Sequence, residues 1–234
     1  MKKNPLFKKI LMFLMLFILL FGSLAGYKLI KEIEKKEFTA NATTFSQIEK
    51  SNPKARKFKF DDSNVDNTAT MNDMIKLQKK AISMQMKENI AGHLKIESIN
   101  QTIPIFIGAN QYTLSLGAAT YFYEDAEMGK GNFVLAGHNM EIPGVIFSDL
   151  FSVKVGDSMD LISNDTIYRY KADRIFKMPG EYTLVNGVPE EGSFLSLPKG
   201  GEKAILTLFT CVYTGNVKQR YVVQGHLNQQ IPNE

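Results

Sequence analysis

The chain has 234 residues, of which 44% are hydrophobic, with 28 Lys+Arg against 24 Asp+Glu, one Cys and no Trp. This composition is too apolar for a disordered chain and too charged for a polytopic membrane protein, and the length allows one or two domains. A single cysteine excludes an intramolecular disulfide and any metal site built from several cysteines.

The charges divide the chain into two parts of opposite sign. Residues 1–88 carry 17 Lys+Arg and 9 Asp+Glu, a net charge of +8 (17 − 9), and residues 89–234 carry 11 and 15, a net charge of −4 (11 − 15). Because the two parts differ this much, we expect them to face different environments. The negative charge of the second part argues against binding to nucleic acid.

A segment long enough to cross a membrane lies near the N-terminus. Four lysines precede the uncharged run from Ile10 to Tyr27, which as a helix spans about 27 Å. The hydrocarbon core of a bilayer is about 30 Å thick, and Leu29 and Ile30 extend the run. We therefore expect residues 1–30 to form a cytoplasmic tip and a single-pass transmembrane signal-anchor, with residues 10–30 in the cell membrane.

A cleaved signal peptide is the alternative interpretation, because Ser23-Leu24-Ala25 resembles a cleavage site. The apolar run exceeds the roughly 7–15 residues of a typical signal core, which favours an uncleaved anchor. Lysines flank both ends of the run, and we place the N-terminus in the cytoplasm and the remainder of the chain outside the cell.

Residues 31–88 are expected to form an extracellular stalk. Lys31 to Glu37 is almost all charge, and the residues from Asn41 to Thr70 are mostly polar, so little apolar surface is available for burial. A helix is predicted near residues 71–88. Its apolar stripe, which we expect to pack against the following domain, comprises Met74, Leu77, Ala81 and Met84.

Residues 89–234 are predicted to be mainly β, with short apolar runs separated by turns. The candidate strands are His93–Ile99, Thr102–Ile107, Asn132–Gly137, Ser158–Ser163, Thr166–Met178, Ala204–Cys211 and Arg220–Leu227. Asn164-Asp165 is a candidate tight turn, and short helices are expected at Tyr112–Ala118 and Phe147–Leu150. Seven or eight strands in about 140 residues indicate one closed β-barrel.

Cys211 is the first candidate for chemistry, since it ends an apolar strand beside a polar loop. A lone cysteine is more often buried and inert, but outside the cell a free thiol without a role is a liability. A thiol with the ordinary pKa of about 8.5 is mostly protonated at neutral pH, so a nucleophilic cysteine needs a base or a cation nearby.

Two residues could supply that base and cation. His138 follows the strand Asn132–Gly137, and Arg220 begins a strand that, paired antiparallel with Ala204–Cys211, would lie beside Cys211. Arginine cannot act as a base, but its fixed donors can hold a carbonyl or an oxyanion. His93 and His226 lack such a context and are interpreted as structural or surface residues, and three scattered histidines give no metal-binding spacing.

Three motifs together carry a family resemblance. Thr207-Leu208-Phe209-Thr210-Cys211 resembles the Thr-Leu-x-Thr-Cys signature of sortases. Leu135-Ala136-Gly137-His138-Asn139 is similar to their histidine motif, and Lys218-Gln219-Arg220-Tyr221-Val222-Val223 to their arginine strand, in the same order. The resemblance covers about residues 90–228. Without a long insertion before Ala204–Cys211 or an Asp-Pro-aromatic lid in the stalk, it is closest to class A.

The resemblance implies a membrane-anchored cysteine transpeptidase of the Gram-positive cell surface, with the eight-stranded sortase β-barrel in residues 89–234. It assigns Cys211 as nucleophile, His138 as general acid/base and Arg220 as the group that holds the substrate carbonyl and oxyanion, assisted by Thr210. Ala136 and Phe209, beside these motifs, would line a groove for the signal's Leu-Pro, and Ala109 is added by rough alignment.

The implied reaction cleaves a Leu-Pro-x-Thr-Gly-like sorting signal between Thr and Gly through a thioester. The implied partners are secreted proteins with a C-terminal sorting signal and the amine of a peptidoglycan precursor of the lipid II type. The alternatives are a membrane-tethered cysteine hydrolase, in which water resolves the thioester, and a surface binding domain in which Cys211 is merely buried.

No cofactor is expected. Some class A sortases bind calcium through acidic residues, and the acidic residues in comparable loops here are Glu124, Asp125, Glu127, Glu190 and Glu191. Their register does not match cleanly. We interpret them as a solvated acidic face and predict no calcium requirement.

Overall fold

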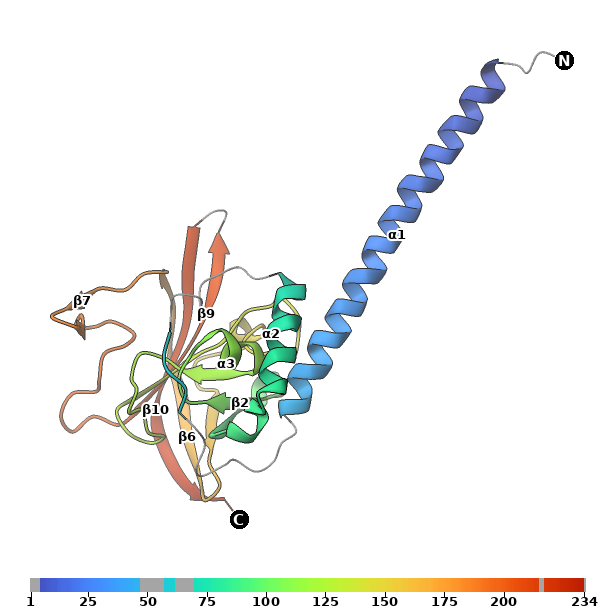
Figure 1. Ribbon diagram of the computed structural model, residues 1–234. Helices are drawn as coiled ribbons and strands as arrows, with labels where there is room; N and C mark the ends of the chain where they lie inside the picture. Colours follow the sequence, from blue (N-terminus) through green and yellow to red (C-terminus); the bar gives the residue numbers. More distant parts are fainter. Residues whose placement is uncertain (1–4, 47–56, 62–69, 215–216, 234) are drawn as a thin grey trace.

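The computed structural model describes residues 5–46, 57–61, 70–214 and 217–233. A β-barrel with short helices on its outside carries one long N-terminal helix that projects away from it (Figure 1). The eight strands of the barrel are β1 (Gly92–Ile96), β2 (Gln101–Phe106), β3 (Ala118–Thr120), β4 (Asn132–Ala136), β5 (Ser158–Ile162), β6 (Thr166–Pro179), β9 (Ile205–Thr214) and β10 (Val217–Pro232).

The barrel closes in the order β1-β2-β3-β4-β9-β10-β6-β5. Neighbouring strands are antiparallel except for two parallel pairs, β2 with β3 and β4 with β9. The predicted closed, eight-stranded barrel is therefore confirmed. The hairpin of β7 (Leu184–Val185) and β8 (Val188–Pro189) lies outside it, in the connection from β6 to β9.

The seven predicted strands all occur, with ends that differ by a few residues. β3 was not predicted, because three small residues in a row give no alternation of polar and apolar side chains. The helix expected at Tyr112–Ala118 is α3 (Gln111–Leu116), which ends before β3 starts. The helix expected at Phe147–Leu150 begins later, as the 3-10 helix η3 (Leu150–Ser152), and Asn164-Asp165 does connect β5 to β6.

Two apolar clusters lie on opposite faces of the sheet. Because side chains alternate along a strand, β9 places Leu206 and Leu208 in the cluster inside the barrel and Phe209 in a second cluster outside it. The outer cluster is covered by helices and by the β6–β9 connection, which contribute Ala81, Leu114 and Phe194 among others. The odd-numbered residues of β9, Cys211 included, therefore belong to the outer face.

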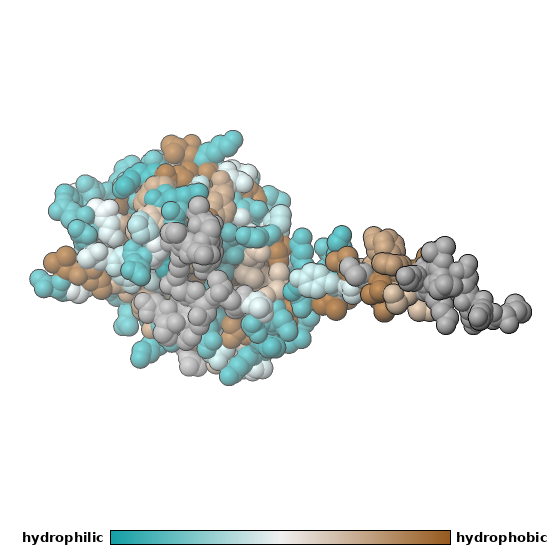
Figure 2. Space-filling view, turned by 90° about the horizontal axis from the view of Figure 1, so that it is seen from above, coloured by the Kyte–Doolittle hydropathy of each residue, from teal (hydrophilic) through white to brown (hydrophobic). Residues whose placement is uncertain are grey.

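The N-terminal helix α1 (Pro5–Ser46) includes the predicted membrane anchor. Within the described residues it is the one helix long and apolar enough to span a membrane. Its apolar side chains point outward, with Phe13 68% and Leu19 71% exposed, and Figure 2 shows this part of α1 as a largely hydrophobic projection from a mostly hydrophilic domain. Exposed apolar surface of this extent suits lipid rather than water.

The segment expected to be a stalk differs from the expectation in its first third. Residues 31–46 continue α1, and Phe38, Ala42 and Phe45 are buried. These three apolar residues lie four and three positions apart, so a helix gathers them on one face despite the polar composition around them. Much of the stretch from 47 to 70 lies outside the described residues.

The helix predicted near residues 71–88 is α2 (Met71–Ser83), followed by the 3-10 helix η1 (Met86–Asn89). Thr70 caps α2, and its side chain and that of Asp73 satisfy each other's backbone N–H groups. The buried stripe is rotated from the predicted one: Met74 and Ala81 are buried as expected, but Ile75 and Gln78 join them and Met84 is 48% exposed.

Candidate active site

Cys211 and Arg220 face each other across the hairpin of β9 and β10. The two residues are direct partners in the antiparallel register, and Arg220 Nη1 donates a hydrogen bond to Cys211 Sγ at 3.0 Å. Cys211 is half-buried, whereas Arg220 is only 2% exposed. A buried positive charge at this distance stabilises an anionic sulfur, which is the reactive form of a thiol.

The guanidinium of Arg220 is held from two further sides. Its Nε donates to the carbonyl oxygen of Gly180 at 3.1 Å, just beyond the end of β6. Its central carbon lies 5.1 Å from the centre of the Phe209 ring, a cation–π contact. These contacts fix the plane of the guanidinium, so its donors stay directed at the sulfur.

His138 reaches the same site from β4. This strand runs parallel to β9 with Ala136 opposite Phe209, so the residues that follow β4 lie beside the last residues of β9. Thr210 Oγ1 donates to the carbonyl oxygen of Gly137 at 2.7 Å, which ties β9 to the residue directly before His138. His138 is half-buried, and its carbonyl oxygen accepts a hydrogen bond from the Phe147 N–H at 3.1 Å.

Six of the seven residues singled out from the sequence line one cavity. They are Ala136, His138, Phe209, Thr210, Cys211 and Arg220, accompanied by Leu114 and Gly137. Ala109 does not line it: the residue is fully buried, and its N–H donates to the carbonyl oxygen of Thr120. The cavity is about 10 Å³, room for no more than one water molecule.

Leu114 and Gly180 also belong to this site, although no residue pattern points to either. Leu114 lies on α3, which was expected from the sequence, but the pattern gave no reason to place that helix over the end of β9. Gly180 contributes only a carbonyl oxygen, and a backbone group leaves no signal in residue types.

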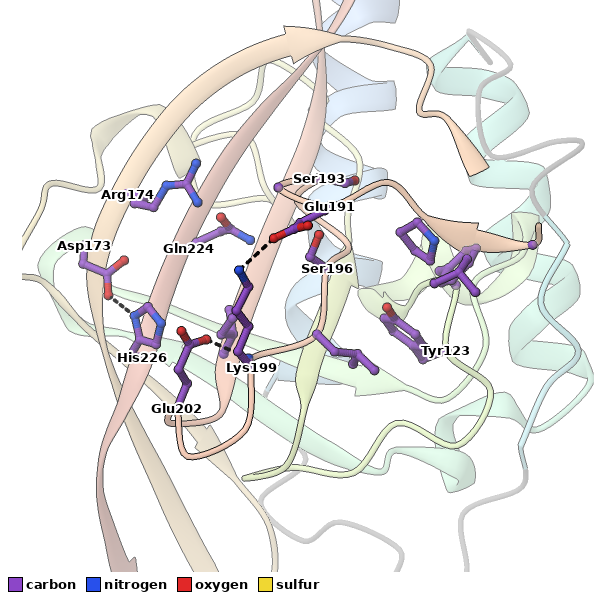
Figure 3. A pocket seen from close by; sticks show the side chains of 17 residues that line it. Tyr123, Asp173, Arg174, Glu191, Ser193, Ser196, Lys199, Glu202, Gln224 and His226 are labelled. Carbon is purple, nitrogen blue, oxygen red and sulfur yellow. Dashed lines mark hydrogen bonds and ion pairs between the residues drawn. The ribbon is translucent and has the colours of Figure 1, made fainter. Parts of the chain in front are cut away.

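A larger cavity, about 670 Å³, lies elsewhere on the barrel's outer face, between β6, β10 and the β6–β9 connection (Figure 3). Its ionisable groups are largely paired with one another: Lys199 Nζ lies 2.7 Å from Glu191 Oε1, and His226 Nδ1 lies 2.5 Å from Asp173 Oδ2. No cysteine lines it, and it does not include the residues around Cys211. Thiol chemistry therefore belongs to the smaller cavity.

The two histidines left out of the predicted site have different surroundings. His226 is half-buried beside Asp173, with 43% of its side chain exposed, as in Figure 3, whereas His93 on β1 is only 4% exposed. Burial lowers the pKa of His93 from its ordinary value of 6.5.

Lysines accompany two of the five acidic residues considered for calcium. Glu127 pairs with Lys130 and Glu191 with Lys199. Within the part of the chain that the structure describes, no three His, Cys, Asp or Glu side chains gather as a metal site would require. The absence of a calcium requirement stays a prediction.

The barrel carries a thiol near the end of β9, a guanidinium that donates to its sulfur, and a histidine that lines the same cavity. These features define a class of β-barrel proteins with a cysteine-based site. Residues 94–228 match the Sortase domain family, and the chain belongs to that family.

Individual relatives agree with this membership. The chain is 35% identical over 142 residues to sortase A of Bacillus anthracis, an alignment that covers 60% of this chain and 61% of that protein. It is 28% identical over 184 residues to sortase A of Listeria monocytogenes, covering 79% and 74%. The solved structure of Listeria monocytogenes sortase A superposes with a TM-score of 0.53 at 28% identity, covering 62% of this chain and 91% of that one. The chain thus spans about three fifths of the length of the Bacillus anthracis relative.

Proposed function

We propose that the protein is a class A sortase-type cysteine transpeptidase that cleaves a Leu-Pro-x-Thr-Gly-like sorting signal between Thr and Gly. The observation that carries the proposal is the 3.0 Å hydrogen bond from Arg220 to the sulfur of Cys211, in a cavity that His138 also lines. Membership of the sortase family supports it.

In the first step, the thiolate of Cys211 attacks the carbonyl carbon of the Thr–Gly bond. The carbonyl oxygen becomes an oxyanion, and the N–H groups of Arg220 stabilise its charge. The C–N bond then breaks, His138 donates a proton to the departing Gly amine, and the Thr carbonyl remains on sulfur as a thioester.

In the second step, an incoming amine attacks the thioester. His138 accepts a proton from that amine, the C–S bond breaks, and Cys211 leaves as the thiolate, so the site returns to its starting state. The amine proposed for the natural reaction belongs to a peptidoglycan precursor of the lipid II type.

Neighbouring residues have supporting roles in this proposal. Thr210 uses its hydroxyl to hold Gly137, which favours a positioning role for Thr210 rather than direct contact with the oxyanion. Ala136 and Phe209, both buried beside the catalytic residues, are proposed to contact the apolar Leu-Pro part of the signal. No such role is retained for Ala109.

The proposed setting is the cell membrane. The apolar part of α1 crosses it once, with the N-terminus in the cytoplasm and the barrel outside the cell, where proteins with a C-terminal sorting signal arrive after secretion. The domain limits proposed are residues 1–30 for the tip and anchor, 31–88 for the segment between and 89–234 for the catalytic barrel.

Mass spectrometry of the detergent-solubilised chain tests the chemistry. After incubation with a Leu-Pro-x-Thr-Gly peptide we expect an acyl adduct on Cys211, absent from Cys211→Ala and from a sample given a peptide of scrambled order. Adding an amine should yield an aminolysis product, whereas release of the free acid alone would establish the hydrolase alternative. No adduct, together with alkylation of Cys211 by iodoacetamide that needs denaturation, would instead support the non-enzymatic binding domain.

A further inference from the structure

The membrane helix does not end where its apolar part ends. α1 continues without interruption to Ser46, and Phe38, Ala42 and Phe45 near its C-terminal end are at most 6% exposed. Phe38 and Ala42 belong to the apolar cluster that includes the barrel interior, and Phe45 belongs to the outer cluster with Ala81 and Leu114. The same rigid element therefore lies in the membrane at one end and packs on the barrel domain at the other.

Polar contacts fix this packing in one register. Asn41 Nδ2 donates to Gln78 Oε1 at 3.1 Å, and Gln78 Nε2 donates to the carbonyl oxygen of Ser115 at 3.0 Å. Gln78 is fully buried, so undocking α1 would remove a partner from a buried amide, which is unfavourable. An ion pair of 2.8 Å between Lys79 and Glu37 lies at the edge of the contact.

This chain of contacts runs from the anchor to the candidate active site. Asn41 lies on α1, Gln78 on α2 and Ser115 on α3, and Leu114, next to Ser115, lines the cavity around Cys211. The orientation of α1 is therefore coupled, through two packed helices, to the end of the barrel that holds the thiol.

The packing also sets which end of the barrel faces the membrane. In Figure 1, α1 rises from the domain on the same side to which the C-terminal end of β9 points, while the C-terminus of the chain lies at the opposite end. Cys211 is among the last four residues of β9. Phe38, the first residue of α1 described as buried, follows Ile30 by eight positions, so the domain begins about 12 Å beyond the apolar stretch.

We propose that the docked end of α1 orients the barrel so that Cys211 faces the bilayer. The orientation rests on the proposed placement of α1 in the membrane and does not depend on catalysis. A rigid connection confines the thiol to a fixed height and direction, which raises its effective concentration for groups held at that height.

The orientation is tested with the one cysteine of the chain. The full chain is labelled at Cys211 with a thiol-reactive fluorophore, placed in phosphatidylglycerol–phosphatidylcholine nanodiscs, and exposed to a lipid whose headgroup carries a nitroxide quencher. We expect quenching in the native chain. We expect the quenching to be lost in a variant with ten Gly and Ser residues inserted between Lys35 and Lys36. The ends of this flexible insert lie about 17 Å apart on average, so the barrel is no longer held rigidly by the membrane segment.

Three further variants make this result specific. Inserting the same ten residues between Asn164 and Asp165, in the β5–β6 turn, should leave the quenching unchanged. Phe45→Asp, which undocks α1 without lengthening the chain, should reduce it, while Ile33→Asp on the exposed part of α1 should not. A native chain without quenching, or a Lys35–Lys36 insertion variant quenched as strongly as the native chain, would overturn the proposed orientation.

Turnover by the unlabelled variants tests the effect of this orientation on catalysis. A sorting peptide carrying its own membrane segment in the same vesicle should be processed on the order of tenfold or more slowly by the Lys35–Lys36 insertion variant, and a soluble sorting peptide at the native rate. Equal rates of the insertion variant and the native chain on the tethered peptide would contradict an orientation that brings Cys211 toward membrane-held groups. Failure of the native chain on both peptides would count against the proposed function alone, since the quenching result would stand.

Discussion

Arg220 Nη1 lies 3.0 Å from Cys211 Sγ because the two residues are direct partners in the register of β9 and β10. The contact is made across a hairpin whose strands are adjacent in sequence, so its geometry depends on local pairing more than on the rest of the barrel. The Gly180 carbonyl and the Phe209 ring then select one orientation of the guanidinium.

Arg220→Lys tests whether the fixed geometry of the guanidinium donors matters beyond their positive charge. Lysine keeps the positive charge but cannot donate to the Gly180 carbonyl and the sulfur at once with the same geometry. We expect kcat/KM for a sorting peptide to fall about 10²–10³-fold, the usual cost of losing one oxyanion donor. Arg174→Lys, an exposed change on β6, is the matched control and should have no effect. An Arg220→Lys enzyme with near-native kcat/KM would contradict the role given to the guanidinium.

Thr210→Val removes a hydroxyl at almost constant shape. The carbonyl oxygen of Gly137 then loses its 2.7 Å hydrogen bond in a buried place, which costs about 1–3 kcal/mol of unfolding free energy. Because Gly137 precedes His138, we also expect kcat/KM to fall. Urea unfolding and peptide kinetics measure the two effects, and Thr210→Ser should recover both. If Thr210→Val loses stability but keeps native kinetics, the hydrogen bond is only structural.

Gly137→Ala tests the packing behind the histidine. A Cβ added at Gly137 would lie 2.5 Å from the ring of Phe147, which is itself only 1% exposed, so either the ring or the backbone beside His138 must shift. We expect a loss of activity toward the sorting peptide that exceeds the loss of thermal stability. Gly200→Ala, where an added Cβ meets nothing within 4 Å, is the control. Native activity in Gly137→Ala would show that His138 tolerates this shift.

Part of this site could be predicted from local sequence alone. Cys211 lies near the end of one apolar run and Arg220 near the start of the next, so antiparallel pairing brings them together. His138, two residues after β4, lies beside them because β4 runs parallel to β9, a long-range pairing that the apolar runs do not indicate. The fold class followed from the number and length of the apolar runs.

The remainder depends on long-range packing. The Phe147 ring packs close to Gly137, and the Gly180 carbonyl accepts a hydrogen bond from Arg220. No residue pattern in the sequence indicates either contact. Ala109 was placed near the site by alignment, but it is buried away from the cavity. The packing of α1 on the barrel domain is indicated in the sequence, because Phe38, Ala42 and Phe45 share one helical face. The charged and polar residues around them dominate the composition of this segment and favour the interpretation as a stalk instead.

Calcium is predicted to have no effect on activity or thermal stability. Lys130 and Lys199 already lie beside Glu127 and Glu191, so the carboxylates that a calcium ion would need are partly neutralised. The measurement is kcat/KM and Tm with added calcium and with a chelator. A Tm that rises steeply with calcium would contradict the prediction, and magnesium at the same concentration controls for ionic strength.

His93 is predicted to make the fold sensitive to mild acid. Its Nε2 is buried and has no hydrogen-bond partner among the described residues, and burial lowers the pKa of the imidazole below its ordinary 6.5. Between the lowered pKa and 6.5, the unfolded chain therefore binds more protons at this residue than the folded chain does, and the free energy of unfolding decreases as the pH falls below about 6.5.

His93→Phe removes the titrating group while keeping a ring in its place. We expect the unfolding free energy of this variant, measured by urea denaturation from about pH 7 to about pH 5, to decrease less than that of the native chain. His226→Phe is the control, because that histidine lies beside Asp173 with 43% of its side chain exposed, and its replacement should leave the contribution of His93 intact. If His93→Phe shows the native dependence on pH, another group is responsible for the acid sensitivity, and the buried imidazole is tolerated in its charged form.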